Sequence, residues 1–473
     1  MTTIERAVPE ATPKTARPWL VLALLATAQL MLVLDVTVVN VALPDIAAGL
    51  GLARTTVPWV MTIYTLFFGG LMLSGGRLAD RYGPRVLALI GLALFVASSA
   101  LTGLAGRGDL LLAGRALQGL SAAVLSPAAL SAALGYFPGP GRQRALAVWS
   151  SLAGIGSALG VVLGGVLTAT AGWRWVFGIN VPIGMALLVA VPVATRHRPA
   201  REPAGGAGFD LPGAVLVTAG TASAVYGVIH GGQGWLSARA IVPLVGAVLL
   251  WTAFALVERV TPRPLLQVSL LMRRPVAAGA LLMLTATGLL VGAFFLGSFT
   301  LQHAHHHGAL ATGLYFIPVA VGTVAGAHLG GELLTRVSSR VVAPAGFGLA
   351  ALGYAAPAVS DRTVALVAGL SVAALGIGAI FVTAFTASLS DAEQAETGLR
   401  SALVNTFHEL GGAVGVSVLS SVAGSALTAA RPSADAFQHA FIAGAVAAAA
   451  SAVAAAAVLP RTFRHPADGR LAH

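Results

Sequence analysis

The sequence predicts an all-helical integral membrane protein with fourteen spanning helices, and both its composition and its hydropathy pattern support this fold class. Of the 473 residues, 57% are apolar and only 10% are charged, whereas a soluble domain carries about 25% charged residues. The apolar residues gather in segments that approach or exceed the length of about 20 residues needed to cross a bilayer. Cysteine is absent, which excludes disulfides, thiolate metal sites and cysteine nucleophiles.

The apolar segments follow one another along the chain in groups of six, two and six. The first segment is longer than the apolar core of a secretory signal, so we expect it to be retained. The last segment is built largely from alanine. The segments are 18–39, 57–75, 86–105, 109–135, 145–170, 175–195, 211–231, 239–258, 276–300, 310–331, 341–360, 363–388, 401–427 and 437–459.

The basic residues predict the orientation of the chain. If the N-terminus is cytoplasmic, the cytoplasmic segments hold 21 of the 28 Lys and Arg residues and the outer loops hold six, with one inside a span. Because cytoplasmic loops carry the excess of positive charge, we expect both termini to be cytoplasmic, in the cell membrane of a bacterium. The formal charge of +11 does not indicate nucleic acid, since these residues are scattered over short loops.

An internal repeat divides the chain into two halves. Residues 75–85 follow the second segment and residues 330–340 follow the tenth, and five of the eleven positions are identical. Duplicated helical halves are typical of many secondary transporters. We predict a cytoplasmic tail (1–17), a six-helix bundle (18–195), cytoplasmic linkers with two inserted helices (196–275), a second six-helix bundle (276–459) and a cytoplasmic tail (460–473).

Three ionisable residues fall inside predicted spans. A charge at the bilayer centre costs at least about 2.5–3.5 kcal/mol unless it is protonated, paired or in water. Asp35 and Glu409 lie in the first and thirteenth segments, and burial favours the protonated form of such a carboxyl group. Arg115, in the fourth segment, either faces the bundle interior near Asp35 or extends to the outer interface. Glu409 either lies in an apolar cavity or is solvated near a helix end, since Arg400 precedes it by only nine residues.

Four motifs, in order, carry a resemblance to a known family. Residues 34–44 match a first-helix motif, and residues 76–85 match a loop between the second and third helices. Residues 111–123 match a fourth-helix motif, and residues 156–165, followed by 173–182, match a fifth-helix antiporter motif and its exit. The chain therefore resembles the major facilitator superfamily and, within it, the fourteen-spanner drug:proton antiporter family 2.

The sequence departs from the family pattern at three positions. Pro84 stands where the loop motif usually has a basic residue, and Val161 stands where the antiporter motif usually has proline. His408 stands where relatives often have arginine. The substitution at Val161 weakens the argument for antiport, although the flanking glycines are intact.

The resemblance implies the major facilitator fold, with two six-helix bundles and two additional linker helices. It implies a secondary active transporter, not an enzyme, that exports hydrophobic or cationic drugs in exchange for protons by alternating access. Asp35, Arg115 and Glu409 would couple transport to protons, and no cofactor is expected. The expected partners are the small-molecule substrate, protons and lipid, with the chain acting as a monomer. A dedicated exporter of one metabolite or antibiotic, or a proton-coupled symporter, remains an alternative.

Two motifs have a mechanical interpretation and a simpler one. The loop at 76–85 is either a breakable latch between the halves or a solvated loop that sets orientation, and Thr335 in the second copy makes a latch mainly one-sided. The latch residues are Gly76, Asp80, Arg81, Gly83 and Arg85. A glycine stripe on one helix face permits close packing, and the resemblance implies that it also seals the path against leak. The stripe is Gly156, Gly160 and Gly164, extended by Gly165.

Further residues are weaker candidates for binding. Aromatic, flexible and polar residues could line a drug cavity, although the same types fill ordinary helix interfaces. These are Met31, Tyr64, Phe67, Phe68, Trp149, Asn405 and His408. A histidine cluster falls in the outer loop between the ninth and tenth spans without an accompanying acid or cysteine, which favours a solvated loop over a metal site. It comprises His303, His305, His306 and His307. His328 and Glu332 share a helix face at the cytoplasmic rim of the tenth span.

Overall fold

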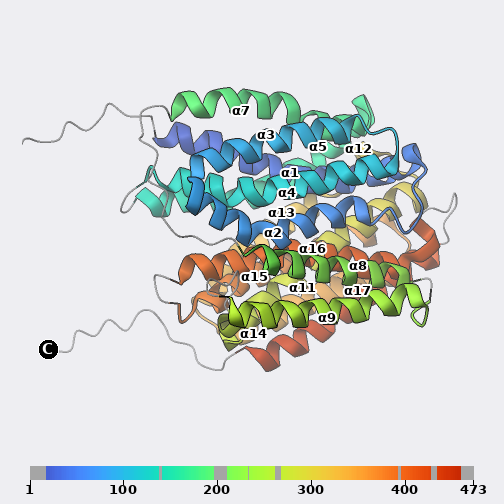
Figure 1. The fold of residues 1–473 in the computed structure, drawn as a ribbon. Coiled ribbons are helices and arrows are strands. Elements are labelled where there is room, and N and C mark those ends of the chain that lie inside the picture. The colour runs from blue at the N-terminus through green and yellow to red at the C-terminus, as the bar shows by residue number, and fades with distance from the viewer. Residues whose placement is uncertain are drawn as a thin grey trace, which may run out of the picture.

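The computed structural model describes residues 18–137, 141–195, 210–232, 234–261, 268–392, 396–427 and 434–459. These residues form helices joined by short connections, with no strand among them, and the helices lie side by side along one direction (Figure 1). Thirteen spans are long and apolar enough to cross a membrane, and a shorter apolar helix at Ile155–Ala171 adds a fourteenth. The predicted all-α membrane fold is confirmed.

The first group of helices makes six passes. Its members are α1 (Pro18–Leu50), α2 (Trp59–Tyr82), α3 (Pro84–Gly103), α4 (Gly108–Leu134), α5 (Gly141–Ala171), α6 (Arg174–Gly178) and α7 (Asn180–Ala194). The short α6 and the longer α7 together make one pass. The turn between α2 and α3 is sharp because Gly83 adopts φ +94°, a conformation that favours glycine, and Pro84 then starts α3 at the position where proline is best tolerated.

The remaining helices comprise an inserted pair and a second group of six passes. The inserted pair is α8 (Leu211–Gly231) and α9 (Ala238–Val260), followed by the short α10 (Val268–Leu271). The second group is α11 (Arg274–Phe299), η1 (Thr300–Ala304), α12 (Ala309–Tyr315), α13 (Ile317–Leu334), α14 (Ser339–Val359), α15 (Thr363–Leu389), α16 (Thr397–Ala423), η2 (Gly424–Leu427) and α17 (Ala434–Val458).

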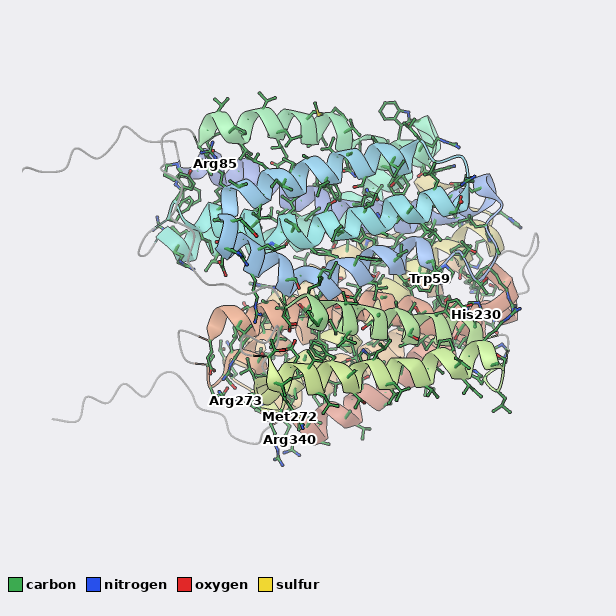
Figure 2. The ribbon with its side chains drawn as sticks, in the orientation of Figure 1. Trp59, Arg85, His230, Met272, Arg273 and Arg340 are labelled. Atoms are coloured by element: carbon green, nitrogen blue, oxygen red, sulfur yellow. The ribbon has the colours of Figure 1, made fainter. Side chains whose placement is uncertain are left out.

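The passes alternate in direction, which defines two faces of the molecule. We call the face where α1 begins and α17 ends the termini face, and the other the distal face. Arg85, Arg273 and Arg340 lie at the termini face, and Trp59 and His230 lie at the distal face (Figure 2).

Helices of the same group pack mainly on one another. In the first group α2 and α3 pack on α4, and α1 packs on α5; in the second, α13 and α14 pack on α15, and α11 packs on α16. The groups meet along two seams, one between α2 and α16 and the other between α5 and the consecutive helices α12 and α13.

The two groups are closed on each other at the distal face. A methyl group added to Gly313 of α12 would lie 2.4 Å from the carbonyl oxygen of Val161 in α5. Gln302 of η1 donates a hydrogen bond to the carbonyl oxygen of Val41 in α1, at 2.8 Å. One buried apolar cluster joins Leu43 of α1 to Phe295 of α11. Packing of this kind holds the two groups together at these contacts.

Several helix ends differ from the prediction. α1 runs to Leu50 instead of 39, and α2 continues to Tyr82, so the predicted loop at 76–85 is wrong except for the turn at Gly83. Residue 400, counted as a loop arginine, lies inside α16. His303 lies in the π-helical η1 instead of a loop. Hydropathy locates only the part of a helix that sits in hydrocarbon, whereas backbone hydrogen bonding continues past it.

Candidate functional site

The carboxylate of Asp35 is the centre of a buried polar cluster near the middle of α1. Arg115 of α4 donates to its Oδ2 atom, and both side chains are fully buried, at 0% exposure. Its Oδ1 atom accepts from Gln118 Nε2 and from Asn180 Nδ2, each at 3.2 Å. Three donors from α4 and α7 thus offset the desolvation of one carboxylate, as a buried charge requires.

Arg115 is compensated on its other sides as well. Its Nε donates to the carbonyl oxygen of Val60 at 2.9 Å, and Nη1 also donates to Gln118 Oε1 at 3.0 Å. The guanidinium lies over the ring of Tyr64, 4.3 Å from its centroid, a favourable cation–π arrangement. Arg115 therefore faces the interior, and the alternative in which it extends to the outer interface is wrong.

Gln118 and Asn180 are members of the site that lie within the motifs at 111–123 and 173–182, although the sequence analysis gave neither of them a role. Gln118 Nε2 also donates to the hydroxyl of Ser99 in α3, at 2.8 Å. Its Nε2 atom thus faces two acceptors and its Oε1 atom accepts from Arg115, which fixes the orientation of the amide. Gln118 lies three residues after Arg115, on the same helix face. That spacing was the available signal for Gln118, whereas Asn180 is brought to Asp35 by the start of α7, which no local pattern predicts.

Glu409 lies in the middle of α16, away from the helix ends, and faces α2. A methyl group added to Gly69 of α2 would lie 2.8 Å from the Cβ atom of Glu409. The side chain of Glu409 is enclosed by other helices on most sides and keeps only partial exposure to solvent. Within the described part of the chain no residue hydrogen-bonds its carboxylate. Tyr64 lies within electrostatic reach of Asp35, Arg115 and Glu409.

His408 adds a polar group beside Glu409. Its Nδ1 atom is 2.8 Å from the Thr287 hydroxyl of α11, and its ring lies against Phe381 of α15, with centroids 5.4 Å apart. Asn405, one turn before Glu409, is partly exposed. His408 therefore points to α11 and α15, whereas Glu409 faces α2.

The predicted substrate-lining residues divide by burial. Three of them, Met31, Tyr64 and Phe68, are buried in the apolar core of the first group. The others keep partial exposure, and these are Phe67, Trp149, Asn405 and His408. In this conformation only the second set has surface to offer a ligand, and the binding role of both sets remains a prediction.

The predicted latch residues lie at the termini end of α2 and the start of α3. Arg85 donates to the carbonyl oxygens of Thr195 (3.1 Å) and Pro192 (3.3 Å) at the end of α7. A cation at a helix C-terminus is favourable. This contact joins two helices of the same group and does not connect the halves. Arg81 lies over the ring of Tyr82, 5.3 Å from its centroid.

The glycine stripe of α5 packs against α1. Methyl groups added to Gly156, Gly160 and Gly164 would contact Val33, Thr37 and Val38 of α1, respectively. The prediction that Gly165 extends this face is wrong, because Gly165 points to the second group. A methyl group there would lie 2.7 Å from the carbonyl oxygen of Ala309 in α12, because the next residue in a helix is turned by about 100°.

Arg400 forms a second buried charge cluster, at the termini end of α16. Its side chain is buried and pairs with Asp391, with Glu396 at 2.7 Å, and with the carbonyl oxygen of Ser388 at 3.0 Å. Glu396 also pairs with Arg273 beside α11, at 3.2 Å. The cluster ties the α15–α16 connection to the start of α11.

The histidine cluster is ordered by neighbours instead of being a simple solvated loop. His305 is 3.1 Å from Asp361 and 2.9 Å from the Thr363 hydroxyl, and His307 is 3.2 Å from the same hydroxyl. His306 adopts φ +56°. Among the described residues no three His, Cys, Asp or Glu side chains are placed to hold a metal ion.

With this geometry in view, comparisons with known proteins identify the family. Residues 25–416 match the model of the Major Facilitator Superfamily, and the chain belongs to that superfamily of membrane transporters. It is a multi-pass membrane protein that moves a small-molecule substrate, and it is not an enzyme.

Relatives of high similarity cover nearly the whole chain. The cephamycin export protein CmcT of Amycolatopsis lactamdurans is 37% identical, over 88% of this chain and 87% of its own. The puromycin resistance protein pur8 of Streptomyces alboniger is 34% identical, over 87% and 83%. The methylenomycin A resistance protein of Bacillus subtilis is 33% identical, over 84% and 86%. These relatives agree with the predicted drug:proton antiporter type.

Solved structures share the fold. A bacterial homologue of the lysosomal transporter Spinster superposes with a TM-score of 0.68 at 16% identity, over 95% of this chain and 98% of the other. An auto-inhibited POT family peptide transporter gives 0.66 at 16% identity, over 96% and 99%. At this identity the likeness speaks to the fold alone.

Proposed function

We propose that this protein exports hydrophobic or cationic antimicrobial compounds across the cell membrane in exchange for protons. The proposal is supported by its superfamily, by relatives named for antibiotic export and resistance, and above all by the buried pair of Asp35 and Arg115. A buried ion pair adds little stability compared with apolar packing. Its presence at the centre of the first bundle is therefore better explained by use.

The proposed coupling is a competition at two carboxylates. As long as Asp35 is ionised, Arg115, Gln118 and Asn180 hold it. A proton on Asp35 removes the charge that holds Arg115, which frees the guanidinium to change partners. Glu409 has no hydrogen-bonding partner among the described residues, so it is available to a second proton or to the positive charge of a substrate. Each acid then binds either a proton or a cation at one time. The protein therefore carries protons in one direction and the substrate in the other.

The proposed architecture for this cycle is two bundles, 18–195 and 276–459, that rock about the buried acids as a monomer. We take the termini face as cytoplasmic, on the positive-inside argument, in a bacterial inner membrane. The dry contact at the distal face then closes the outer side, and the reverse state requires Gly313 to separate from Val161. Protons supply the drive, and no cofactor is required.

Reconstituted protein tests the proposal directly. We expect a fluorescent lipophilic cation to move against its gradient when a pH difference is imposed across the liposome, and Asp35→Asn to abolish this movement without loss of folded protein. Asp109→Asn, at an exposed site beside Arg107, is the matched control and should behave as the unchanged protein. Movement that ignores the pH difference, or full activity of Asp35→Asn, contradicts the proposal.

A dedicated exporter of one antibiotic is the second candidate, and the three relatives described above favour it, since each of their names gives a single compound. The two candidate functions differ in the range of substrates that the protein would export. An exporter-depleted host that carries this protein, grown against a panel of compounds, separates them. Resistance to chemically unrelated cations supports a broad exporter, and resistance to one scaffold supports a dedicated one.

A further inference from the structure

We propose that the histidines between η1 and α12 sense pH for the distal closure. Protons taken up from the distal side break the contacts that hold this connection, and the closure then loosens. The sensing residues are His305 and His307, and their partners are Asp361 and Thr363 at the start of α15. The inference rests on the proposed function in one respect, which is that the distal closure opens during transport.

The connection from η1 to α12 joins two of the contacts that close the distal face. Gln302, in η1, donates to the carbonyl oxygen of Val41 in α1 at 2.8 Å. α12 begins at Ala309, whose carbonyl oxygen would lie 2.7 Å from a methyl group added to Gly165 of α5. Because residues 303–308 connect these two points, a change in their path shifts both contacts.

The path of this connection is strained and is held by a side chain on either side of the strain. His306 has φ +56°, in the left-handed region that is uncommon for residues other than glycine. His305, which precedes it, lies 3.1 Å from Asp361 and 2.9 Å from the Thr363 hydroxyl. His307, which follows it, lies 3.2 Å from the same hydroxyl. Backbone strain persists only where the surroundings over-determine it, so the two imidazole rings stabilise the turn.

Neutral imidazoles satisfy every member of this network. An ionised carboxylate only accepts hydrogen bonds, so the Nε2 atom of His305 carries a proton and donates to Asp361. Its Nδ1 atom then accepts the one proton of the Thr363 hydroxyl. The oxygen of that hydroxyl accepts in turn from the Nε2 atom of His307. Each donor in the chain therefore has its own acceptor.

A second proton on His305 breaks this arrangement. The Nδ1 atom becomes a donor, so the Thr363 hydroxyl loses the acceptor of its own proton, and two N–H groups compete for one oxygen. The new charge pairs with Asp361, but that carboxylate is 58% exposed, and an exposed ion pair contributes little. The side chain of His305 is only 10% exposed, which leaves its charge poorly hydrated. Histidine ordinarily changes charge between about pH 5 and 8, so acid on the distal side favours release of the turn.

The other histidines of the connection oppose further protons. The rings of His305 and His307 have centroids 6.3 Å apart, and His303 and His306 act on each other electrostatically. Among the described residues, Asp361 is the one carboxylate that pairs with the connection. Once that carboxylate is paired, each added proton is repelled by the charge already present.

The elements packed on the connection add no further carboxylate among the described residues. Arg362, next to Asp361, is exposed and positive. On α12, the ring of Tyr315 lies against His307, with centroids 5.0 Å apart. On α17, the residues that line the pocket beside His305 carry no charge, and these are Phe437, Gln438 and Phe441. The surroundings therefore strengthen the response to acid instead of neutralising it.

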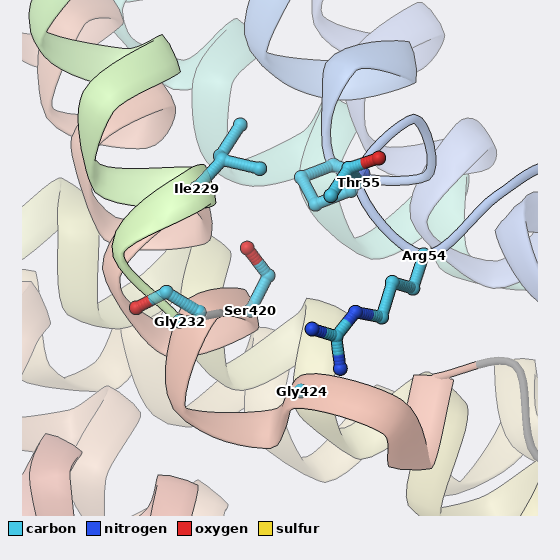
Figure 3. Close-up of a pocket in the computed structure, with 8 residues that line it drawn as sticks. Arg54, Thr55, Ile229, Gly232, Ser420 and Gly424 are labelled. Carbon is cyan, nitrogen blue, oxygen red and sulfur yellow. The ribbon is translucent and has the colours of Figure 1, made fainter. Parts of the chain in front are cut away.

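The α2–α16 side of the distal face has no such network (Figure 3). There Ile229 of α8 and Ser420 of α16 lie around a cleft of about 230 Å³, together with Arg54 of the α1–α2 connection. No histidine is among the described residues that line this cleft, and arginine keeps its charge throughout the physiological range. His230 lies nearby on α8, but its ring stacks on Tyr226, with centroids 4.0 Å apart. It is therefore a matched control on the same face.

Pulsed EPR on this cysteine-free chain measures the closure. Nitroxide labels at Thr170→Cys on α5 and Leu314→Cys on α12, both exposed positions, report the distance between the two groups at the distal face. The background is Asp35→Asn with Glu409→Gln, without substrate, so the two buried acids no longer titrate. We expect the population at the longer distance to rise about two- to fivefold between about pH 7.5 and 5.5, the range for one partly exposed charge pair. Failure of the proposed function is distinct, because it would appear as a lack of proton-driven efflux in the unaltered protein.

Three variants in the same background locate the response. His305→Gln combined with His307→Gln removes both titrating rings and should keep the short distance at both pH values. Thr363→Val removes the shared hydroxyl but no titrating group, and should give the longer distance already at the higher pH. His230→Gln should respond as the background does. The inference is overturned by a background that ignores pH, by a double histidine variant that still responds or is open at both pH values, by a closed Thr363→Val, or by loss of the response in His230→Gln.

Discussion

At the scale of single residues, buried charge in this protein is compensated within a few ångströms. Asp35 faces three donors, and Arg400 faces two carboxylates and a carbonyl oxygen. Removing one partner from such a cluster leaves the other desolvated, which is more damaging than the loss of the bond alone. Variants that keep the charge and change the geometry therefore separate electrostatics from hydrogen bonding.

Arg115→Lys is such a variant. Lysine keeps the positive charge but cannot hold Asp35, Gln118 and the Val60 carbonyl oxygen with one planar fork. We expect a loss of about 1.5–3 kcal/mol in stability, the range for hydrogen bonds to charged groups, together with weaker proton-driven efflux. Thermal unfolding in detergent measures the first and the liposome assay the second. Arg107→Lys, on an exposed arginine just before α4, is the control, and equal stability of the two variants contradicts the assigned contacts.

Which residues of the site were predictable follows from charge. Asp35, Arg115 and Glu409 stand out because a formal charge within an apolar segment is rare. Gln118 and Asn180 fall within matched motifs, but they are neutral, and their residue type alone does not assign them to the site. Arg400 was assigned to a loop because its acidic partners precede it in a polar stretch, and only the packing of α16 against α15 buries it.

At the scale of helices, hydropathy located every span but not every end. The termini end of α2 carries a charged stretch that hydropathy assigns to a loop, yet the helix continues to Tyr82, and Gly75 within it packs closely on α4. A methyl group at Gly75 would lie 2.0 Å from the Ala123 carbonyl oxygen. Such close approach between backbones needs glycine for space and not for a turn, and a single sequence does not distinguish the two uses.

The Arg400 cluster gives a prediction at this scale. Arg400→Met removes the cation that joins the α15–α16 connection to the start of α16 and leaves Asp391 and Glu396 beside each other. We expect a loss of about 2–3 kcal/mol in stability, at and below the lower end of the range for broken buried pairs, because Asp391 is half exposed. Thermal unfolding measures it against Arg336→Met, an exposed arginine. A loss no larger than the control's would mean that the cluster is not coupled to folding.

The contact between α5 and α12 gives a second prediction at the scale of helices. Gly313→Ala would set a methyl group 2.4 Å from the Val161 carbonyl oxygen, and because that atom belongs to the backbone the helices must separate. We expect the distal closure to loosen. A cysteine at the buried position Leu43 should then react faster with a membrane-impermeant maleimide added from the distal side. Gly348→Ala, with nothing within 4 Å, should not change the rate, and equal rates in both variants would place the closure elsewhere.

At the scale of the whole molecule, the sequence repeat predicts two halves, and the packing of the helices divides in the same way, although the exact limits of the two bundles remain a prediction. The position of the inserted pair was not predictable. Its helices show no periodic polar face, and its partners Arg77, Gly70 and Ala413 lie far away in the sequence. Placement of this kind depends on how two bundles leave a seam to be covered, which is a property of their assembly and not of any segment.

The charges at the termini end predict which bundle carries the inserted pair as the halves rock. Asp210 and Glu258 lie near Arg77 of α2, whereas the contacts of α8 with α16 are apolar or with backbone. Apolar surfaces slide past one another more readily than ion pairs separate, because dispersion contacts are individually weak and are re-formed in the new position. We therefore expect α8 and α9 to move with the first bundle.

Pairs of cysteines in this cysteine-free chain test that expectation. A Cβ atom at Gly70 would lie 3.3 Å from the Cβ atom of Thr218, close to disulfide geometry, so Gly70→Cys with Thr218→Cys ties α8 to α2. Ile229→Cys with Ala413→Cys, from one packed cluster, ties α8 to α16 through a short bis-maleimide. We expect proton-driven efflux to survive the first tie and to stop with the second. The reverse pattern would assign the inserted pair to the second bundle, and loss of efflux with both ties would mean that α8 moves against each half in turn.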